Sequence, residues 1–327
     1  MIVEIKILGY KISMTPLIKS PINYTGNKYR ILPQLIPHMP EQMNVMVDLF
    51  CGGATVGANI NCKKVIFVDN NRVVIGLLDY FARYKNIKKL IKELVKLTDQ
   101  FNLTCSGLNG YSIYKKKLVE KNTNNGLKEI NKDGFYLLRN TYNALTNKGT
   151  AKAFNMLYLL IAYGFNNDIR FSNDGQYNLP VGKTDLNKNN IQKIEAFNER
   201  MSMIDFEFVC AEFNSQTAQN YIQDSDFVYI DPPYLIMHAV YNENPKWDNE
   251  SEYKLLDLLN TFLQSGKKFM LSNITEKKGA KNEPLSYWIR THSEKVTVIN
   301  IDYHYRSASY NKKLRDANES EIILLPK

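Results

Sequence analysis

The chain has 327 residues, of which 44% are hydrophobic, so it is long enough for one large or two modest domains with a substantial core. Lys and Arg outnumber Asp and Glu by 42 to 33, and the net charge of +9 favours a polyanionic partner over a membrane surface. The first ten residues lack the apolar core of a signal peptide, and no apolar run is long enough to span a bilayer. We therefore expect a cytoplasmic protein that does not contact a membrane.

Cysteines and histidines are few and widely spaced. There are four of each, with no Cys-x-x-Cys pair and no metal-ligand spacing: Cys51, Cys62, Cys105 and Cys210, and His38, His238, His292 and His304. We expect no metal site, and we interpret the thiols as small buried or incidental residues of a reducing compartment.

The first informative segment in chain order is an apolar strand, Val45 to Leu49, followed by Phe50-Cys51, the paired glycines Gly52-Gly53 and a helix-compatible run. Glycines let the backbone approach a ligand closely, and the free N–H groups at a helix start favour electronegative groups. The segment has the arrangement of a nucleotide-binding turn, although it is not a strict G-x-G-x-x-G.

A second apolar strand, Val65 to Val68, ends in Asp69. In dinucleotide-type folds an acid at the end of the second strand binds ribose hydroxyls. Two strand-end acids, Asp48 and Asp69, favour an adenosine-containing ligand over a plain helix cap at Asp69. On these residues alone a dehydrogenase stays open.

Between about Gly76 and Ile194 the composition changes, and we interpret this part as an inserted domain. Lys-rich helical patterns at Ile87 to Leu97 and Tyr111 to Val119 precede Asn- and Gly-rich loops with interleaved aromatics. Tyr163 to Pro180 predicts a hairpin with Asn173-Asp174-Gly175 as its turn. Its amides, aromatics and arginine suit base-edge and phosphate contacts in DNA, and an ordinary polar surface hairpin is the alternative.

The strand Phe227 to Ile230 ends in Asp231-Pro232-Pro233-Tyr234. The prolines restrict the backbone, so the Asp231 carboxylate and the Pro232 carbonyl are two acceptors aimed at one point. An NH2 group on a flat ring offers two matching donors, and Tyr234 adds a ring on which a base can stack. The alternative is a strand-end turn with an N-capping aspartate.

Further strands are predicted at Met203 to Cys210, Lys268 to Ser272, Val296 to Tyr303 and Glu321 to Leu325, with helices such as Glu252 to Leu263 between them. This alternation predicts an α/β fold with a Rossmann-like, doubly wound, mostly parallel sheet.

Taken in order, these segments resemble the DNA adenine methylase (Dam) family, the alpha group of site-specific DNA N6-adenine methyltransferases. The resemblance covers roughly Ser20 to Leu325, and motif order is its most specific feature. The motifs are Asn23-Tyr24-Thr25-Gly26-Asn27-Lys28, Asp48-Leu49-Phe50-Cys51-Gly52-Gly53, Asp69, the Tyr163 to Pro180 hairpin, Asp231-Pro232-Pro233-Tyr234, Leu271-Ser272-Asn273 and Arg306-Ser307-Ala308-Ser309.

The resemblance implies S-adenosylmethionine as cofactor and three segments with separate tasks. Residues 1–75 and 195–327 would form the catalytic domain, and residues 76–194 a mainly helical target-recognition domain that carries the β-hairpin. Asp231 to Tyr234 would be the catalytic loop, with Asp231 also near the cofactor. The other implied cofactor contacts are Tyr24 and Lys28 enclosing it, Asp48, Phe50, Gly52 and Gly53 along its methionine side, Asp69 at the ribose, and Glu212 and Phe213 at the adenine.

For DNA, the resemblance assigns Arg170 to reading a guanine, Asn166 and Pro180 to neighbouring contacts, and Arg306 and Ser307 to the vicinity of the substrate. The chain also departs from the family. Asn23 replaces a DNA-contacting lysine, and Asn167-Asp168 replace a Gly-Leu pair of GATC enzymes. A short palindrome that contains adenine, such as GATC or CATG, is therefore as far as the target can be narrowed.

The expected function is methyl transfer to a flipped adenine in duplex DNA, in a restriction-modification, prophage or epigenetic context. Asp231 separates this reading from relatives with Ser-Pro-Pro-Tyr (cytosine N4) and Asn-Pro-Pro-Tyr (protein glutamine), and no Pro-Cys supports cytosine C5 chemistry. A non-catalytic nucleic-acid-binding protein with a retained cofactor pocket is the remaining alternative. We expect a monomer, with a cognate restriction endonuclease as a functional partner and no physical complex implied. Stacking needs the ring of Tyr234, so Tyr234→Phe is expected to be mild.

Overall fold

The computed structural model describes residues 3–7, 10–14, 16–114, 118, 125–237, 247–277, 279–301 and 321–327, and the chain forms two compact units. The helical unit comprises Met1–Tyr29, Gly52–Asn59 and Arg72–Ile204. The sheet unit comprises Arg30–Cys51, Ile60–Asn71 and Asp205–Lys327. The predicted functional domains at 1–75, 76–194 and 195–327 stay a prediction, because compactness does not say which segment binds cofactor or DNA.

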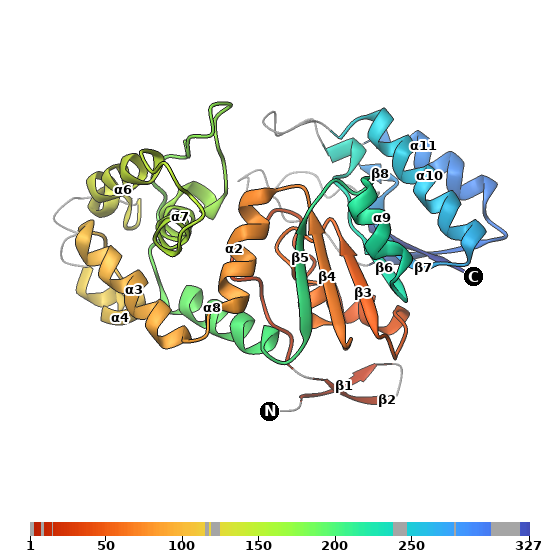
Figure 1. Cartoon of the computed structure of the whole chain (residues 1–327), viewed down its shortest axis with the longest axis horizontal. Helices are drawn as coiled ribbons and strands as arrows, with labels where there is room; N and C mark the ends of the chain where they lie inside the picture. Colours follow the sequence, from red (N-terminus) through yellow and green to blue (C-terminus); the bar gives the residue numbers. More distant parts are fainter. Residues whose placement is uncertain are drawn as a thin grey trace. The chain divides into compact units, whose positions relative to one another are not determined.

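In the sheet unit, seven strands of the described chain form one sheet in the order β10-β11-β7-β6-β3-β4-β5. Figure 1 shows β5, β4, β3, β6 and β7 following one another in that order. All adjacent pairs from β5 to β7 are parallel, whereas β11 is antiparallel to both of its neighbours. This confirms the predicted α/β fold with a mostly parallel, Rossmann-like sheet. The strands are β3 (Val45–Leu49), β4 (Lys64–Asp69), β5 (Asp205–Cys210), β6 (Phe227–Ile230), β7 (Lys268–Ile274), β10 (Val296–Ile301) and β11 (Glu321–Pro326).

The central strands are mostly apolar because both faces of a parallel sheet are covered. Every residue of β6 is buried, and β3 and β4 are buried from their second residue onward. Strand β5 begins at Asp205 and not at Met203, which lies 62% exposed in the turn after the preceding helix. The last two residues of the strand predicted at Val296 to Tyr303 lie outside the described residues.

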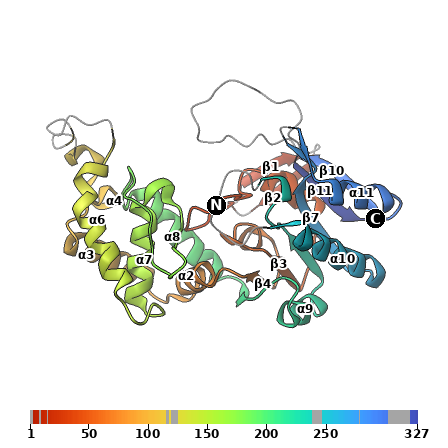
Figure 2. The same ribbon diagram turned by 90° about the horizontal axis from the view of Figure 1, so that it is seen from above.

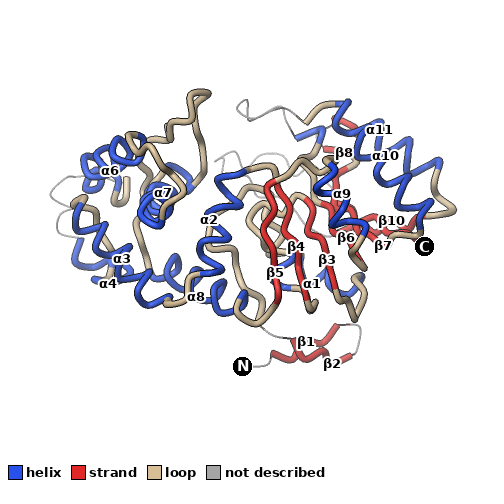
Figure 3. Tube along the Cα trace, in the orientation of Figure 1, coloured by secondary structure: helices blue, strands red, loops and turns tan. Residues whose placement is uncertain are grey.

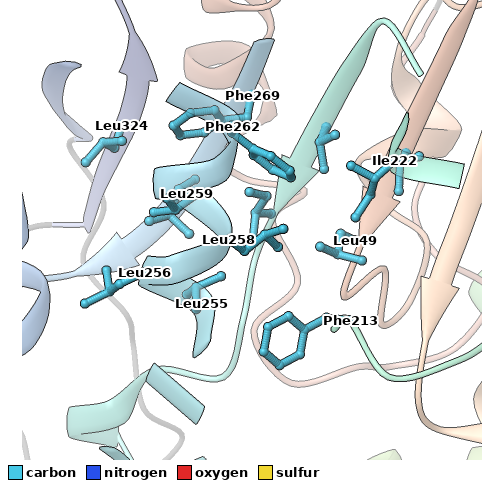
Figure 4. Packing of buried hydrophobic residues seen from close by; sticks show 14 of the residues in the cluster. Leu49, Phe213, Ile222, Leu255, Leu256, Leu258, Leu259, Phe262, Phe269 and Leu324 are labelled. Atoms are coloured by element: carbon cyan, nitrogen blue, oxygen red, sulfur yellow. The ribbon is translucent and has the colours of Figure 1, made fainter. Parts of the chain in front are cut away.

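Helix α10 (Asn249–Ser265) contributes much of the core against this sheet. It begins where the Asp248 side chain accepts a 2.9 Å hydrogen bond from the Ser251 N–H, and it ends at Gly266, whose φ of 68° is left-handed. Apolar residues at spacings of three and four form one face of the helix. Figure 4 shows that face against the sheet, with Leu255, Leu256, Leu258, Leu259 and Phe262 of α10 near Phe269, Leu49 and Leu324.

The remaining elements of the sheet unit are short. They are α1 (Leu32–Leu35), η1 (Ile36–His38), α9 (Gln216–Gln223), η5 (Leu235–Met237), α11 (Glu283–Thr291), and the small hairpin of β8 (Glu276–Lys277) and β9 (Ala280–Lys281).

Strand order reverses at β3 and β6: β4 and β5 lie on one side of this pair, and β7, β11 and β10 lie on the other. In doubly wound sheets, ligands bind beyond the carboxyl ends of the strands at such a switch point. Leu49 and Ile230 are partners at these carboxyl ends, so Phe50 and Asp231 both start from the switch point.

The turn after β3 differs from the prediction, since no α-helix follows the paired glycines. Gly52 and Ala54 have φ values of 47° and 58°, which a right-handed helix cannot contain, and only the 3-10 helix η2 (Gly57–Asn59) follows. The expected helix N-terminus is therefore absent from this turn.

The helical unit is built around α7 (Ala151–Tyr163), whose residues from Asn155 to Tyr163 are all buried. Helices α2, α3 and α6 pack against α7, and α8 packs against α2. Figures 2 and 3 show these helices lying together. The unit contains β1 (Val3–Ile7), β2 (Tyr10–Met14), η2, α2 (Arg72–Arg83), α3 (Ile87–Gln100), α4 (Ser106–Asn109), η3 (Tyr111–Tyr114), α6 (Lys128–Asn143), α7, η4 (Phe165–Asn167) and α8 (Lys188–Met201).

The predicted helix at Ile87 to Leu97 is confirmed by α3. At Tyr111 to Val119 the described part is the 3-10 helix η3, and residues 115–117 and 119 lie outside the described residues. The hydroxyl of Tyr114 in this 3-10 helix accepts from the Cys105 N–H at 2.8 Å.

The predicted turn Asn173-Asp174-Gly175 is confirmed, with Gly175 at φ 74° and its N–H donating to the Ser172 carbonyl at 2.9 Å. The arms pair at two isolated antiparallel bridges, Phe171 with Tyr177 and Gly164 with Val181, and form no regular strands. The first predicted arm is interrupted because α7 continues to Tyr163 and Phe165–Asn167 form a 3-10 turn. We call residues 164–182 the recognition loop.

Candidate active site

The catalytic-loop candidates leave the sheet at the carboxyl end of β6. The Asp231 N–H donates to the Leu49 carbonyl of β3 at 3.4 Å, so the sheet pairing extends to the acid itself. Asp231 is half-buried, Pro232 is buried and Pro233 is exposed. The loop continues into the 3-10 turn η5, and the Asp231 carboxylate accepts from Tyr234 in place of capping an α-helix.

Tyr234 connects two carboxyl groups. Its hydroxyl lies 3.1 Å from Oδ1 of Asp231 and 3.0 Å from Oε1 of Glu321, the first residue of β11. Tyr234 is 7% exposed and Glu321 is 2% exposed. The sequence did not point to Glu321, because about ninety residues separate it from the loop and no local pattern marks it.

A buried tyrosine of β6 lies among the same acids. The Tyr229 hydroxyl is 2.8 Å from Oγ of Ser272 in β7. Burial raises the pKa of Tyr229 well above its ordinary value, and the charges of Asp231, Glu321 and Asp48 raise it further. Three carboxyl groups from β3, β11 and the catalytic loop therefore lie close to one buried hydroxyl.

Three aromatic rings form a cluster beside the switch point, which we call the aromatic cluster. The ring centroids of Phe50 and Phe213 are 5.1 Å apart, and Trp247 lies 5.5 Å from Phe50 and 5.6 Å from Phe213. Phe50 is held at φ 66°, an uncommon conformation for a bulky side chain that tends to occur at functional sites. Trp247 was not predicted, since no sequence pattern relates it to residues so distant.

Trp247 is held by a buried acid on α10. Its indole N–H donates to Oε2 of Glu252 at 2.5 Å, and the Asn282 amide donates to Oε1 at 2.7 Å. Burial raises the pKa of Glu252, and these two hydrogen bonds oppose the rise. Because both carboxylate oxygens have donors, the acid fixes the ring that packs on Phe50 and Phe213.

The acid at the end of β4 is buried and oriented by the backbone. Asp69 is 8% exposed, and its Oδ1 accepts from the Asn71 N–H at 2.8 Å. Beside it, the Asn70 amide donates to the exposed Glu212 carboxylate at 3.2 Å. The Cys51 thiol has a pKa raised well above its ordinary value by burial and then by Asp69 and Asp48, so the thiol is neutral. This edge presents carboxylates and aromatic rings together.

In the helical unit, the paired glycines serve the protein's own side chains. A Cβ on Gly52 would lie 2.6 Å from the Tyr24 ring, and a Cβ on Gly53 would lie 2.9 Å from Oγ of Ser20. Lys28 is buried, and its ammonium donates to the Gly26 carbonyl at 3.0 Å. The close approach inferred for a ligand is thus required here by Tyr24.

The recognition loop brings its predicted DNA contacts together within the helical unit. Asn166 and Pro180 are exposed at its base, where the Phe165 N–H donates to the Pro180 carbonyl at 2.9 Å. Arg170 is half-buried, and its Nε donates to Oδ1 of Asn178 at 2.7 Å.

Asn23 contacts the same loop, because its amide donates to the Asn166 carbonyl at 3.2 Å. Arg306 and Ser307 lie outside the described residues, and so does the motif that contains them.

Over the residues that the structure covers, no group of three or more His, Cys, Asp and Glu side chains could hold a metal ion. No helix within that same part of the chain is long and apolar enough to cross a membrane.

Comparison with protein families gives one match that spans most of the chain. Residues 24–306 match the model described as D12 class N6 adenine-specific DNA methyltransferase. The chain is 32% identical over 308 residues to the modification methylase StsI of Streptococcus sanguinis, and 33% identical over 316 residues to the type II methyltransferase M.FokI of Planomicrobium okeanokoites. Each alignment covers 92% of this chain and 42% of the relative. The chain therefore spans about two fifths of the length of these curated relatives.

A more distant relative is named as a DNA adenine methylase, the family that the sequence motifs resemble. The DNA adenine methylase of Salmonella typhi is 25% identical over 221 residues, which cover 68% of this chain and 66% of the relative.

Proposed function

Because the chain belongs to the family of D12 class N6 adenine-specific DNA methyltransferases, we propose that it methylates N6 of an adenine in double-stranded DNA, with S-adenosylmethionine as methyl donor. The observation that carries the proposal is Asp231-Pro232-Pro233-Tyr234 at the carboxyl end of β6, where strand order reverses. Ligands of doubly wound sheets bind at this position.

The residues along this edge fit the proposed cofactor. Asp69 is a buried strand-end carboxylate suited to ribose hydroxyls, and the ring of Phe213 suits the adenine, with Phe50 packed beside it on the methionine side. Glu212 adds an acceptor beside Asp69, and Asp48 adds a negative charge suited to the cationic methionine part. When bound, S-adenosylmethionine would supply a methyl group on a positively charged sulfur, which makes that methyl group electrophilic.

Four further residues with proposed cofactor contacts belong to the helical unit. Gly52 and Gly53 leave room for Tyr24, whose ring we propose encloses the cofactor with Lys28. The buried ammonium of Lys28 is fixed by the Gly26 carbonyl, so its position is set before a ligand arrives.

The catalytic loop matches the needs of an adenine amine. The N6 lone pair is delocalised into the ring, so the amine is a poor nucleophile. Two acceptors, the Asp231 carboxylate and the Pro232 carbonyl, would bind its two N–H groups and favour the form that exposes the lone pair. The product amine has to lose one proton, and Asp231 or water would accept it. Reaching this amine requires the adenine to leave the duplex and stack on Tyr234.

DNA recognition is assigned to the recognition loop, with Asn166, Arg170 and Pro180 as contacts. Arg170 can bind two acceptors of a guanine once it exchanges its bond to Asn178 for the base. Asn23, which stands in place of the family's DNA-contacting lysine, donates to the Asn166 carbonyl of this loop, and we propose an adenine-containing target such as GATC or CATG. We place Arg306 and Ser307 near the substrate on the family resemblance alone. We further propose that the protein acts as a monomer, paired functionally with a restriction endonuclease of the same specificity.

The proposal is tested by tritiated methyl transfer to DNA with Asp231→Ala. Removing the acidic acceptor should lower the single-turnover rate by at least about 100-fold, because it stabilises the developing charge on N6. Wild-type activity in Asp231→Ala would refute the assignment. Expression in a methylation-free host followed by single-molecule sequencing would report the modified base and the motif. N4-methylcytosine would favour the cytosine alternative, and unmodified DNA with intact cofactor binding would favour a non-catalytic binder.

A further inference from the structure

The contact between Tyr234 and Glu321 extends the proposed catalytic loop to the antiparallel strand β11. Antiparallel pairing places Glu321 opposite Ile274 of β7 and Ile301 of β10. The following residues Ile322, Ile323 and Leu324 are buried and apolar. Glu321 is thus a buried acid at the start of an otherwise apolar strand.

A buried carboxyl group is costly unless its hydrogen bonds compensate, and an apolar side chain of similar size is often at least as stable in such a position. Glu321 is such a buried acid, at 2% exposure. Its Oε1 accepts from the Tyr234 hydroxyl, which also lies within hydrogen-bond distance of Asp231. The acid therefore contacts the loop that we assign to chemistry, and buried acids at such positions are often functional.

The Tyr234 hydroxyl cannot donate to Asp231 and Glu321 at the same time. It has one proton, so Tyr234 donates to one carboxylate at a time. Two bonding positions on opposite acids nevertheless fix the hydroxyl, and through it the plane of the ring. A ring held in one plane is already oriented for stacking, and an Asp231 carboxylate held by the same hydroxyl is oriented toward the amine.

We propose that Glu321 is a positioning residue for methyl transfer, acting through the Tyr234 hydroxyl on both the stacking ring and Asp231. This inference rests on the function proposed above. It also changes the expectation for Tyr234→Phe, since the ring alone is not sufficient if its hydroxyl sets its orientation.

Four variants test the proposal by single-turnover methyl transfer, with KM values for DNA and S-adenosylmethionine. Tyr234→Phe and Glu321→Leu should each slow transfer by about 10-fold, the effect of losing one hydrogen bond to a charged group. The double variant should be no slower than the slower single variant, since both remove the same contact. Glu321→Gln retains an amide oxygen that accepts from the hydroxyl, so its rate should stay within about 3-fold of wild type. The KM for S-adenosylmethionine should not change, because the lost contact does not involve the cofactor.

Thermal unfolding and calorimetric binding of S-adenosylmethionine control for misfolding. A wild-type rate in Glu321→Leu, or losses that multiply to about 100-fold in the double variant, would overturn the proposal. If Glu321→Leu does not fold, a wild-type rate in Tyr234→Phe overturns it equally. Wild-type protein that transfers no methyl group to DNA would instead refute the proposed function. Active wild-type protein without the expected coupling would refute only the role of Glu321.

Discussion

Gly52 lies in the left-handed region with the Tyr24 ring directly against it. Two separate costs therefore oppose a side chain there: the backbone conformation and the overlap with the ring. Gly26 has a φ of 83° with no atom within 4 Å of its Cβ position, so it carries only the first cost. Comparing Gly52 with Gly26 therefore separates the cost of the backbone conformation from the cost of the overlap with the ring.

We predict that Gly52→Ala lowers the free energy of unfolding by about 3 kcal/mol, and Gly26→Ala by about 1 kcal/mol. Urea unfolding of both variants measures the difference. Adding Tyr24→Ala to Gly52→Ala should recover part of the loss, because the overlapping ring is removed. Equal losses of stability in the two variants would show that the Tyr24 ring is not the reason why position 52 requires glycine.

Arg170 is the single charged group among the predicted loop contacts, and its bond to Asn178 holds it within the recognition loop. Arg170→Ala should weaken specific DNA binding by about 10-fold to 100-fold and relax selectivity at one base pair. Fluorescence anisotropy with matched and single-substituted duplexes measures both effects.

Arg83 provides the matched control for this change, since it is an exposed arginine of the same unit paired with Asp79 on α2. Arg83→Ala removes the same charge away from the loop, and we expect no change in base selectivity. Loss of affinity in both variants without any change in selectivity would mean that Arg170 contacts only the DNA backbone.

At the scale of elements, the first turn of α10 holds the aromatic cluster in place. Glu252 binds the Trp247 indole and the Asn282 amide, whereas Glu250 in the same turn is exposed and pairs with Lys254. Two acids two residues apart thus differ in burial and in partners. Replacing each acid separately therefore tests whether α10 supports the proposed cofactor site.

Glu252→Met keeps the side-chain volume and leaves two buried donors without an acceptor. We predict a loss of about 3 kcal/mol in stability and about 10-fold weaker binding of S-adenosylmethionine, because Trp247 loses its fixed position. Denaturant unfolding and calorimetry measure these changes. Glu250→Ala should alter stability by less than about 0.5 kcal/mol. Unchanged cofactor affinity in Glu252→Met would show that the fixed position of Trp247 does not support cofactor binding.

At the scale of the whole molecule, an aspartate at the amino-terminal edge of the sheet makes the free energy of unfolding depend on pH. Oδ2 of Asp226, just before β6, accepts from the N–H groups of Asn44 and Val45 at 2.6 and 2.9 Å. The bonds from Val45 and Asn44 lower the pKa of Asp226 below its ordinary value. The ionised form is therefore favoured by folding, and its stabilisation is present above the unfolded pKa and lost as pH falls through the folded one.

We predict that Asp226→Asn lowers the free energy of unfolding by about 1 kcal/mol at pH 7, a small value because the group is exposed. The difference from wild type should shrink as pH falls below about 4. Urea unfolding at a series of pH values measures it. Methyl transfer should not change, since Asp226 lies at the edge opposite the catalytic loop. A difference in the free energy of unfolding that stays constant down to pH 2 would show that it does not come from the ionised Asp226 carboxylate.

Local patterns in the sequence were sufficient for most regular elements. β6 was predicted at Phe227 to Ile230 as observed, and α10 extends only slightly beyond its predicted ends. Such patterns succeed because a buried strand or an amphipathic helix depends on residues within one short segment. The turn after β3 was mistaken for a helix start, since glycines permit positive φ without showing where it occurs.

The sequence by itself determined the α/β class and most of the strands, the strand-end acids and Asp231-Pro232-Pro233-Tyr234, and its motif order indicated the family that the comparison confirms. Only the tertiary structure decided that Glu321 contacts Tyr234, that Trp247 completes the aromatic cluster, and that the glycines accommodate Tyr24. Each of these is a contact between residues far apart in the chain. Such contacts depend on strand order and packing, which no local spacing of residues specifies.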